Sequence, residues 1–213
     1  EAVKHKDYEM GIAFDGDADR VAVVDDTGRL LSSEQLAYVL LGTLFAERDG
    51  PVIANVECSR MLETIADKHG REVIRVRVGH TYLFKAMQEH DACFGVEKSG
   101  HMGVPHIFPL DDGVAVGLYA AAVVSQSERD LSELVDTIPT YHRDRIAYSV
   151  PDSEKFALIE RLQDRLVDRY ENTNTMDGIR VDLPDGWALI RASNTSPKIR
   201  LTVEAETGDA FER

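Results

Sequence analysis

The segment PVIANVECSRMLETIADKHGREVIRVRV, residues 51–78, decides the fold class of this 213-residue chain. Two runs rich in β-branched residues, PVIANVE and REVIRVRV, flank the amphipathic stretch SRMLETIADKHG. Short apolar runs are typical of buried strands, whereas apolar residues three and four positions apart are typical of a helix. The segment therefore predicts a strand, a helix and a second strand, the unit from which parallel sheets are built.

The same alternation of strands and helices continues on both sides of this segment. Ser32 and Gln35 form a capping box, which predicts the start of a helix that Gly50 closes. Further strands and helices are expected at residues 11–14, 21–24, 34–48, 81–90, 92–97 and 111–127. This pattern predicts an α/β fold whose sheet is mixed and mainly parallel.

The pattern changes near Ile138 and Pro139, and we place a domain boundary within residues 136–144. Beyond it we expect one long amphipathic helix and several strands, two of which flank a Pro-Asp-Gly turn. These elements cover residues 145–150, 153–170, both sides of 184–186, and 199–206. One helix with several antiparallel strands predicts a small α+β domain.

The composition is acidic, with a net charge of -14 from 38 acidic and 24 basic residues. Such a surface repels a nucleic-acid backbone, so we expect no nucleic-acid partner. No apolar run approaches the roughly 20 residues of a membrane span, so we expect no membrane partner either. The bases are 17 Arg and only 7 Lys. An acidic, lysine-poor surface stays soluble in concentrated salt, which leads us to expect a halophilic source.

The cysteines and the N-terminus indicate where the protein is located. Cys58 and Cys93 lie outside any CxxC pattern, and we expect two buried thiols rather than a disulfide or a metal site. The N-terminal EAVKHKDYEMG has no basic start leading into an apolar stretch, so it does not resemble a signal peptide. We therefore expect a cytoplasmic protein, and a segment of a longer one.

The stretch FDGDADRVAVV places Asp15, Asp17 and Asp19 at alternate positions of a turn between two expected strands. Alternate side chains in a tight turn can point to one centre, and three carboxylates suit a hard cation such as Mg²⁺. Arg20 adds a phosphate-binding cation. An EF-hand would require Gly in place of Arg20 and Glu in place of Asp26. A solvated acidic turn without a ligand is the remaining alternative.

Two more loops carry polar side chains at the ends of expected strands. In GVEKSGH, Glu97 and Ser99 are suited to exchange hydrogen bonds with sugar hydroxyls, although an ordinary polar turn would have the same sequence character. In VGH, His80 is suited to transfer protons or contact a phosphate, but it could equally be the first residue of a helix.

The loop RASNTSPK lies between two expected strands and combines cations with hydroxyl, amide and backbone N–H donors. Its candidate residues are Arg191, Ser193, Asn194, Thr195 and Lys198. A concave cluster of such donors is one way in which proteins hold a phosphate. A surface hairpin rich in turn-forming residues is the alternative.

These four loops, in this order, resemble those of the α-D-phosphohexomutase superfamily, in its phosphomannomutase/phosphoglucomutase branch. DGDADR is similar to the family's metal-binding loop, GVEKSGH to its sugar-recognition loop, and RASNTSP to its phosphate-binding loop. VGH resembles a loop at the substrate-facing end of the same domain. The resemblance implies that residues 1–30 end the second of four domains, 31–138 form the third, and 139–213 form most of the fourth.

The resemblance also implies a role for each candidate residue. The implied Mg²⁺ ligands are Asp15, Asp17 and Asp19, and the implied catalytic residues are Arg20 and His80. The implied substrate-binding residues are Glu97, Ser99, His101, Arg191, Ser193, Asn194, Thr195 and Lys198. In the family, a phosphoserine exchanges its phosphoryl group with a hexose phosphate through a bisphosphate. The motif of that serine, Ser-His-Asn-Pro, is not in this sequence. The implied partners are therefore N-terminal domains of the same protein, and the chain alone is expected to be inactive.

Three alternative functions stay open. The chain could be a non-catalytic module that binds Mg²⁺ and a sugar phosphate. It could belong to a phosphoglucosamine mutase, which we favour less because such mutases usually carry Gly where Asn194 lies. It could also be a phosphatase with an aspartate nucleophile, although such enzymes usually carry Thr where Asp19 lies.

Overall fold

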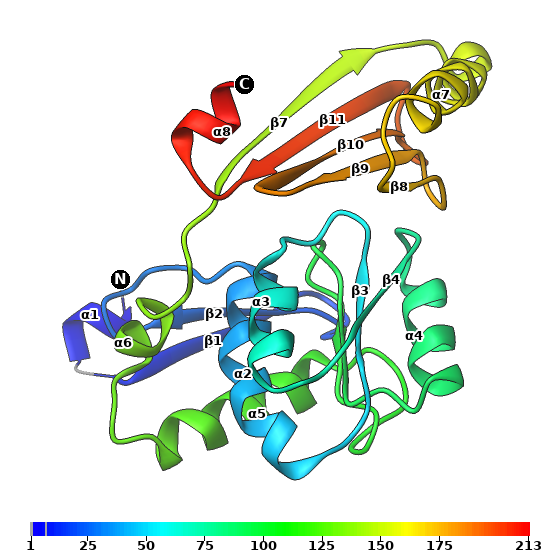
Figure 1. Cartoon of the computed structure of the whole chain (residues 1–213). Coiled ribbons are helices and arrows are strands. Elements are labelled where there is room, and N and C mark those ends of the chain that lie inside the picture. Colours follow the sequence, from blue (N-terminus) through cyan, green and yellow to red (C-terminus); the bar gives the residue numbers. More distant parts are fainter. Residues whose placement is uncertain (1, 7) are drawn as a thin grey trace. The chain divides into compact units, whose positions relative to one another are not determined.

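The computed structural model describes residues 2–6 and 8–213, which belong to two compact units. Unit 1 spans Glu1–Pro139 and unit 2 spans Thr140–Arg213 (Figure 1). Each unit has its own sheet. The expected separation of residues 1–30 from the rest of unit 1 stays a prediction.

The main sheet of unit 1 has four strands in the order β4-β3-β5-β6. The central strand β3 (Val52–Asn55) is parallel to β4 (Val73–Val76) and to β5 (Phe94–Val96). The edge strand β6 (Met102–Gly103) pairs antiparallel with β5. The predicted α/β fold with a mixed, mainly parallel sheet is thereby confirmed, although the two-residue β6 was not expected.

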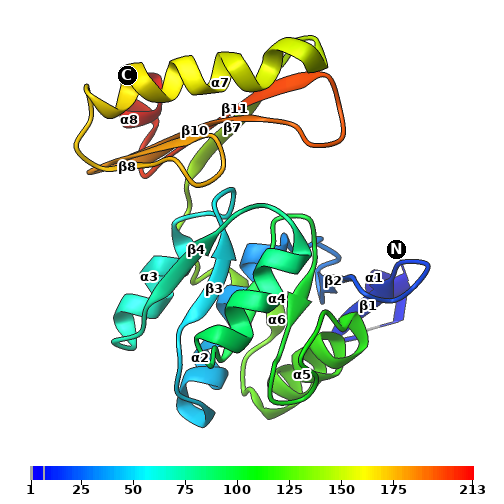
Figure 2. The same cartoon turned by 90° about the vertical axis from the view of Figure 1, so that its right-hand side faces the viewer.

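Helices cover both faces of this sheet. On one face lie α2 (Ser33–Glu47), α3 (Met61–Lys68) and α5 (Gly113–Gln126), and on the other lies α4 (His80–Glu89) (Figures 1 and 2). Successive side chains of β3 therefore alternate between two cores: Ile53 packs with the α4 residues, and its neighbours pack with those of α2. This burial on both faces explains the continuous apolar character of the strand.

A separate antiparallel pair of strands, β1 (Met10–Phe14) and β2 (Val21–Asp25), carries the acidic turn. Two strands alone are marginally stable, so this hairpin needs a covering element. Helix α5 provides it: a Cβ built on Gly117 would lie 3.1 Å from Ile12 and 3.3 Å from Phe14. Two short helices of unit 1, α1 (Ala2–Lys6) and α6 (Leu131–Val135), were not predicted.

Unit 2 is an antiparallel five-stranded sheet with one long helix on a face. The strand order is β7-β11-β10-β9-β8, and α7 (Asp152–Val167) packs against the middle of the sheet (Figure 2). The strands are β7 (His142–Ser149), β8 (Thr173–Asn174), β9 (Ile179–Leu183), β10 (Gly186–Ala192) and β11 (Lys198–Ala205), and the short helix α8 (Gly208–Glu212) follows. The predicted small α+β domain is confirmed.

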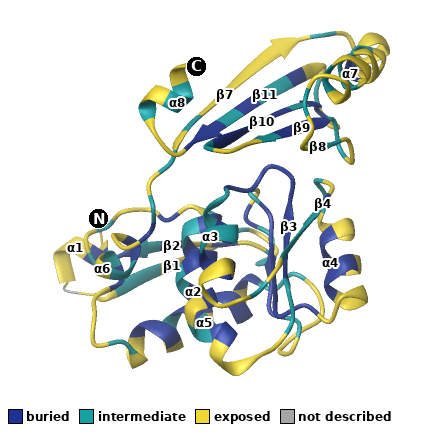
Figure 3. Ribbon diagram, viewed as in Figure 1, coloured by how far each residue is buried: buried dark blue, intermediate teal, exposed yellow. Residues whose placement is uncertain are grey.

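The burial pattern agrees with these cores (Figure 3). Strand β3 is buried throughout, whereas much of α7 is exposed. Cys58 and Cys93 are both buried free thiols, as expected, and burial raises the pKa of Cys93 to about 11. Among the described residues, no helix is both long enough and apolar enough to cross a membrane.

Candidate functional site

The acidic turn, residues 15–20, connects β1 to β2 and brings its three carboxylates together. One ligand atom from each of Asp15, Asp17 and Asp19 lies within 4.8 Å of the others. The turn is tight: Ala18 has a φ of 59°, and its N–H donates to the carbonyl of Asp15 at 3.3 Å. A left-handed conformation costs a non-glycine residue about 1 kcal/mol, so the fold holds this turn against a local preference.

The N-terminus of α5 is packed on the acidic turn. The N–H of Gly113 donates to the carbonyl of Ala18 at 3.0 Å. A Cβ at Gly113 would approach the backbone of Arg20 to 2.7 Å and the Ala18 carbonyl to 2.8 Å, so only glycine allows this contact. Sequence reasoning placed the helix but missed this role of Gly113.

Arg20 is engaged by the carboxylates beside it. Its Nε donates to Asp15 Oδ2 at 2.6 Å and lies 3.5 Å from Asp19 Oδ1. Burial raises the pKa of Asp15, but the backbone and side-chain hydrogen bonds from Arg20 outweigh that effect and hold the pKa below its usual range. Arg20 thus helps to keep this carboxylate ionised, which the expectation of a phosphate-binding cation did not foresee.

The acidic turn has the properties of a cation site. Three carboxylates and one guanidinium leave excess negative charge, and Asp19 Oδ1 is buried without a hydrogen bond from any described residue. Closely spaced carboxylate oxygens are ligands that Mg²⁺ prefers, so the residues present fit the expected ion. Strands flank the turn where an EF-hand has helices, which argues against that alternative.

The sugar-loop candidates lie next to the acidic turn. Residues Arg20 and His101 form an isolated antiparallel β-bridge between the two loops. A pocket of about 500 Å³ lies along this junction, and its polar lining includes Asp15, Arg20, Lys98 and Ser99. The structure therefore combines the metal and sugar candidates in one part of unit 1.

Glu97 connects the sugar loop to the VGH turn. Its side chain is buried, with 2% of the residue exposed. One carboxylate oxygen accepts from the N–H of Gly79 at 2.6 Å, and the other accepts from the hydroxyl of Ser99 at 2.9 Å. Glu97 therefore holds the sugar loop and the VGH turn together. Because His80 follows Gly79 in the chain, this contact also positions His80.

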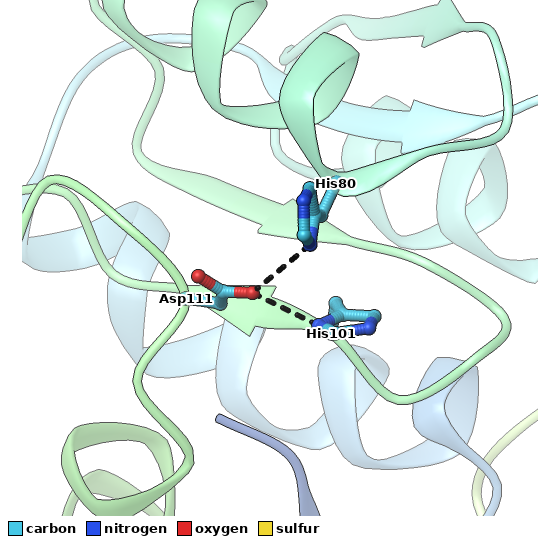
Figure 4. Close-up of side chains that lie close together, drawn as sticks. All are labelled: His80, His101 and Asp111. Atoms are coloured by element: carbon cyan, nitrogen blue, oxygen red, sulfur yellow. Dashed lines mark hydrogen bonds and ion pairs between the residues drawn. The ribbon is translucent and has the colours of Figure 1, made fainter. Parts of the chain in front are cut away.

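His80, His101 and Asp111 converge beside these loops (Figure 4). The Nδ1 atom of His101 lies 2.9 Å from Asp111 Oδ2, and that of His80 lies 3.7 Å from the same oxygen. His101 Nδ1 is also 3.6 Å from Asp19 Oδ2, which links this cluster to the acidic turn. With its proton on Nδ1, His101 donates to Asp111 and leaves Nε2 free to accept a proton.

The sequence analysis gave Asp111 no role in the site and placed it only at the start of the helix expected over residues 111–127. The contact with His101 depends on the fold, because His101 directly precedes β6 whereas Asp111 lies between β6 and α5. His80, His101 and Asp111 also have ligand atoms within 4.8 Å of one another. Two imidazoles and a carboxylate would suit Zn²⁺ better than Mg²⁺. The contact of 2.9 Å is that of a hydrogen bond, so the acidic turn fits the expected Mg²⁺ better than this cluster does.

The phosphate-loop candidates all belong to unit 2, where residues 193–197 connect β10 to β11. Arg191 and Ser193 are buried, whereas Asn194, Thr195 and Lys198 are exposed. Arg191 pairs with Asp177 at 3.1 Å. The loop therefore combines a buried arginine with exposed polar groups, and its role in holding a phosphate stays a prediction. The other candidates, Asp15, Asp17, Asp19, Arg20, His80, Glu97, Ser99 and His101, all belong to unit 1.

Two family models match the chain. Residues 32–141 match the phosphoglucomutase/phosphomannomutase α/β/α domain III, and residues 146–213 match the C-terminal domain of the same family. A probable phosphoglucosamine mutase of Methanopyrus kandleri is 36% identical over 206 residues, which are 96% of this chain and 46% of that protein. A phosphomannomutase/phosphoglucomutase of Pseudomonas aeruginosa is 35% identical over 99% of this chain and 46% of its own length.

Solved structures agree with these sequence matches. A phosphoglucomutase/phosphomannomutase family protein from Burkholderia thailandensis superposes with a TM-score of 0.85 and 28% identity, over 100% of this chain and 46% of that one. The chain thus spans about half the length of the relatives that it matches. None of these comparisons supports the expected halophilic source. Because the two models together match most of the chain, it belongs to the phosphoglucomutase/phosphomannomutase family of the α-D-phosphohexomutase superfamily and corresponds to the C-terminal part of its relatives.

Proposed function

We propose that this chain supplies the Mg²⁺-, sugar- and phosphate-binding loops of a phosphohexomutase. The complete enzyme would interconvert a hexose 1-phosphate and a hexose 6-phosphate through a phosphoserine and a bisphosphate. The observation that carries the proposal is the contact of the His101–Asp111 pair with Asp19, because it combines a proton acceptor with a candidate cation site.

The acidic turn would hold the metal through Asp15, Asp17 and Asp19. When bound, Mg²⁺ would neutralise charge on the phosphoryl group that is transferred. Arg20 keeps Asp15 in its ionised form and limits the repulsion among the three carboxylates before the ion binds. Its exposed side chain remains suited to the catalytic role proposed for it, the positioning of the phosphoryl group.

Proton transfer at the sugar hydroxyl is assigned to the histidines. A hydroxyl that attacks a phosphoryl group must lose its proton, and a positioned base contributes about 10²- to 10⁴-fold to such a step. The geometry favours His101 as this base, since Asp111 orients its ring, and His80 lies edge-on to it at 5.3 Å. The sequence had favoured His80 for the proton transfer, and we retain His80 as a contact to substrate.

The remaining candidates would bind the substrate. Ser99 would contact sugar hydroxyls from the lining of the pocket, with Lys98 close by. Glu97 is buried and accepts a hydrogen bond from the hydroxyl of Ser99, so it would orient that hydroxyl toward the sugar. In unit 2, the loop between β10 and β11 would hold the phosphate that is not transferred, through Arg191, Ser193, Asn194, Thr195 and Lys198. Recognition of this kind gives affinity and orientation, whereas the chemistry belongs to the loops of unit 1.

The phosphoserine would come from N-terminal domains of the same protein. The relatives are about twice as long as this chain, which leaves room for such domains. Ile12 and Phe14 on β1 are exposed, a property that suits a hairpin with further protein beside it. We further propose a cytoplasmic location, with which the two free thiols are compatible.

The identity of the hexose phosphate is less closely defined by the relatives. Relatives named as phosphomannomutase/phosphoglucomutase and as probable phosphoglucosamine mutase have similar identities, 35% and 36%. These similar identities give no support for excluding glucosamine phosphate on the basis of Asn194. We propose mannose and glucose phosphates as substrates, with glucosamine phosphate as the alternative that these relatives keep open.

The test uses the full-length protein encoded by the complete reading frame. Mannose 1-phosphate, glucose 1-phosphate and glucosamine 1-phosphate are each assayed with Mg²⁺ for conversion to the 6-phosphate. We expect turnover with at least one, and none with the 213-residue chain alone. Binding without turnover, in a reading frame that lacks Ser-His-Asn-Pro, would show a non-catalytic module. Release of free phosphate as the main product would show a phosphatase.

A further inference from the structure

Lys155, in the first turn of α7, is buried beneath the phosphate loop. Only 3% of the residue is exposed. Its ammonium donates to the carbonyl of Ser193 at 2.6 Å and to that of Ser196 at 3.1 Å, and it pairs with Asp152 at 2.6 Å. The three N–H groups of the ammonium therefore have three partners, two of which are the ends of one loop.

This position is unfavourable for a lysine unless the charge is used. Removing an ammonium from water is costly, and a cation in the first turn of a helix is opposed by the helix dipole. Methionine has a similar length and would fill the same space without either cost. The ion pair with Asp152 and the hydrogen bonds to the carbonyls of Ser193 and Ser196 offset this cost, and two of these three contacts are with the loop.

The hydrogen bond to Ser193 also sets the direction of a donor of the loop, whereas the carbonyl of Ser196 precedes Pro197, which has no N–H. A trans peptide unit is planar, with its C=O and N–H groups pointing in opposite directions. Since the carbonyl of Ser193 points at Lys155, the N–H of Asn194 points to the opposite side of the loop. Within the described part of the chain, neither Asn194 nor Thr195 donates its backbone N–H to another residue, and both are exposed.

We propose that Lys155 is a positioning residue of the phosphate loop. It draws the carbonyls of Ser193 and Ser196 inward, so that backbone N–H groups between them face an incoming phosphate. Its positive charge, held away from water, adds to the attraction for the anion. This inference rests on the proposed phosphate-binding role of the loop and assigns a function to a residue outside it.

The test is a titration of the ¹⁵N-labelled 213-residue chain with inorganic phosphate, followed by NMR shifts of the amides of residues 191–198. In the Lys155→Met variant, we expect the dissociation constant to rise at least about tenfold, with altered amide shifts at Asn194 and Thr195 before phosphate is added. In Lys155→Arg, which restores the charge and the donors, we expect a value within about threefold of the original.

Two further variants separate this role from a general loss of stability. Trp187→Phe removes a buried hydrogen bond to Glu204, at 2.8 Å, in the same sheet but roughly 20 Å along β10 from the loop. It should lower stability and leave phosphate affinity unchanged. Asp152→Asn removes the exposed partner of Lys155, and should strengthen phosphate binding about twofold because less of the ammonium charge is neutralised.

The outcomes distinguish the role of Lys155 from the binding role of the phosphate loop. Unchanged affinity in Lys155→Met, with normal binding in the original chain, overturns the role of Lys155 and leaves the proposed function intact. Absence of phosphate-induced shifts at 191–198 in the original chain overturns the binding role of the loop, and the inference with it. Where Lys155→Met does not fold, weaker binding in Asp152→Asn than in the original chain overturns the inference.

Discussion

The acidic turn and the phosphate loop are both short connections between neighbouring antiparallel strands, yet they are built in opposite ways. The acidic turn gathers three carboxylates, has a residue in a left-handed conformation, and retains excess negative charge. The phosphate loop has its carbonyls drawn inward by a buried ammonium and its polar groups exposed. The acidic turn concentrates hydrogen-bond acceptors at one point, whereas the phosphate loop directs two of its carbonyl acceptors to the buried Lys155.

This difference indicates how each loop obtains its shape. Repulsion among carboxylates must be offset by Arg20 and, in the proposed function, by a bound cation. The phosphate loop already has an internal cation that fixes it before any ligand binds. Binding of a cation should therefore change the first loop more than binding of an anion changes the second. The predictions that follow test this contrast.

The largest expected effect separates chemistry from binding. In the full-length protein, His101→Ala should lower kcat by about 10³-fold, because the proposed proton acceptor is lost. Asn194→Ala, in the phosphate loop, should instead raise KM about tenfold and change kcat little. Steady-state kinetics on the preferred hexose phosphate measures both. If both variants change kcat and KM alike, the division of roles between the loops is wrong.

The next prediction concerns the metal. Asp19→Asn should weaken binding of Mg²⁺ about 100-fold, measured by calorimetry or by displacement of Mn²⁺ in electron paramagnetic resonance. Asp26→Asn is a matched control, because this carboxylate also belongs to the hairpin region but bonds Ser132 at 2.8 Å. Equal losses in the two variants would show a general charge effect and no defined site. Neither variant should change the phosphate affinity of residues 191–198.

A smaller effect is expected at the base of the β1–β2 hairpin, where Asp25 is the buried charged group. It accepts from the hydroxyl of Thr27 at 2.6 Å and from the N–H and Nε of Arg29, each at 2.8 Å. Burial raises the pKa of Asp25, but the hydrogen bonds from Thr27 and Arg29 lower it by more, so the pKa lies below its usual value. Asp25→Asn should reduce the free energy of unfolding by about 2 kcal/mol at pH 7.

The pH dependence of this effect follows from the direction of the pKa shift. A carboxyl whose pKa is depressed in the folded state stabilises the protein above its unfolded pKa, about 4, and loses this contribution as the pH falls. The difference between the original chain and Asp25→Asn should therefore be constant from pH 8 to pH 5 and shrink below pH 4. Denaturant unfolding across this range measures it. A difference that grows on acidification would contradict the assignment.

The smallest prediction concerns the conformation of the acidic turn. Ala18→Gly should stabilise the chain by up to about 1 kcal/mol, because glycine adopts the observed φ of 59° without strain. It should also weaken Mg²⁺ binding about twofold, since the free turn becomes less ordered. Asp91→Gly, at a φ of 47° elsewhere in unit 1, is the control and should leave Mg²⁺ binding unchanged.

Much of the fold followed from local sequence patterns. The β-branched runs that became β3 and β4, and the capping box at Ser32, depend on neighbours a few residues away, so they could be predicted. The shortest elements, such as β6 and α6, could not be predicted, because two to five residues carry too little periodicity. Their formation depends on pairing and packing supplied by the rest of the unit.

The site was predictable as separate loops and much less as a set of contacts. The acidic turn could be predicted from the sequence, because its three carboxylates lie within five consecutive residues. The pairing of Asp111 with His101, and of Lys155 with Ser193, depends on tertiary structure. No pattern in the sequence distinguishes these residues from the many other acids and bases of the chain. The pairing of Arg20 with Asp15 was missed for another reason. A guanidinium can donate its hydrogen bonds either to a ligand or to a neighbouring carboxylate, and the sequence does not show which.

The distribution of cysteine provides an internal reporter of opening. Cys58 and Cys93, the only two cysteines of the sequence, both lie in the core of unit 1, and unit 2 has none. A thiol reagent reacts with the thiolate, which burial and the raised pKa of Cys93 both suppress in the folded state. Alkylation during exposure to denaturant therefore follows the unfolding of the unit that carries the acidic turn, separately from the unit that carries the phosphate loop. Slower alkylation on addition of Mg²⁺ would reveal the ion's stabilising effect without any assay of turnover.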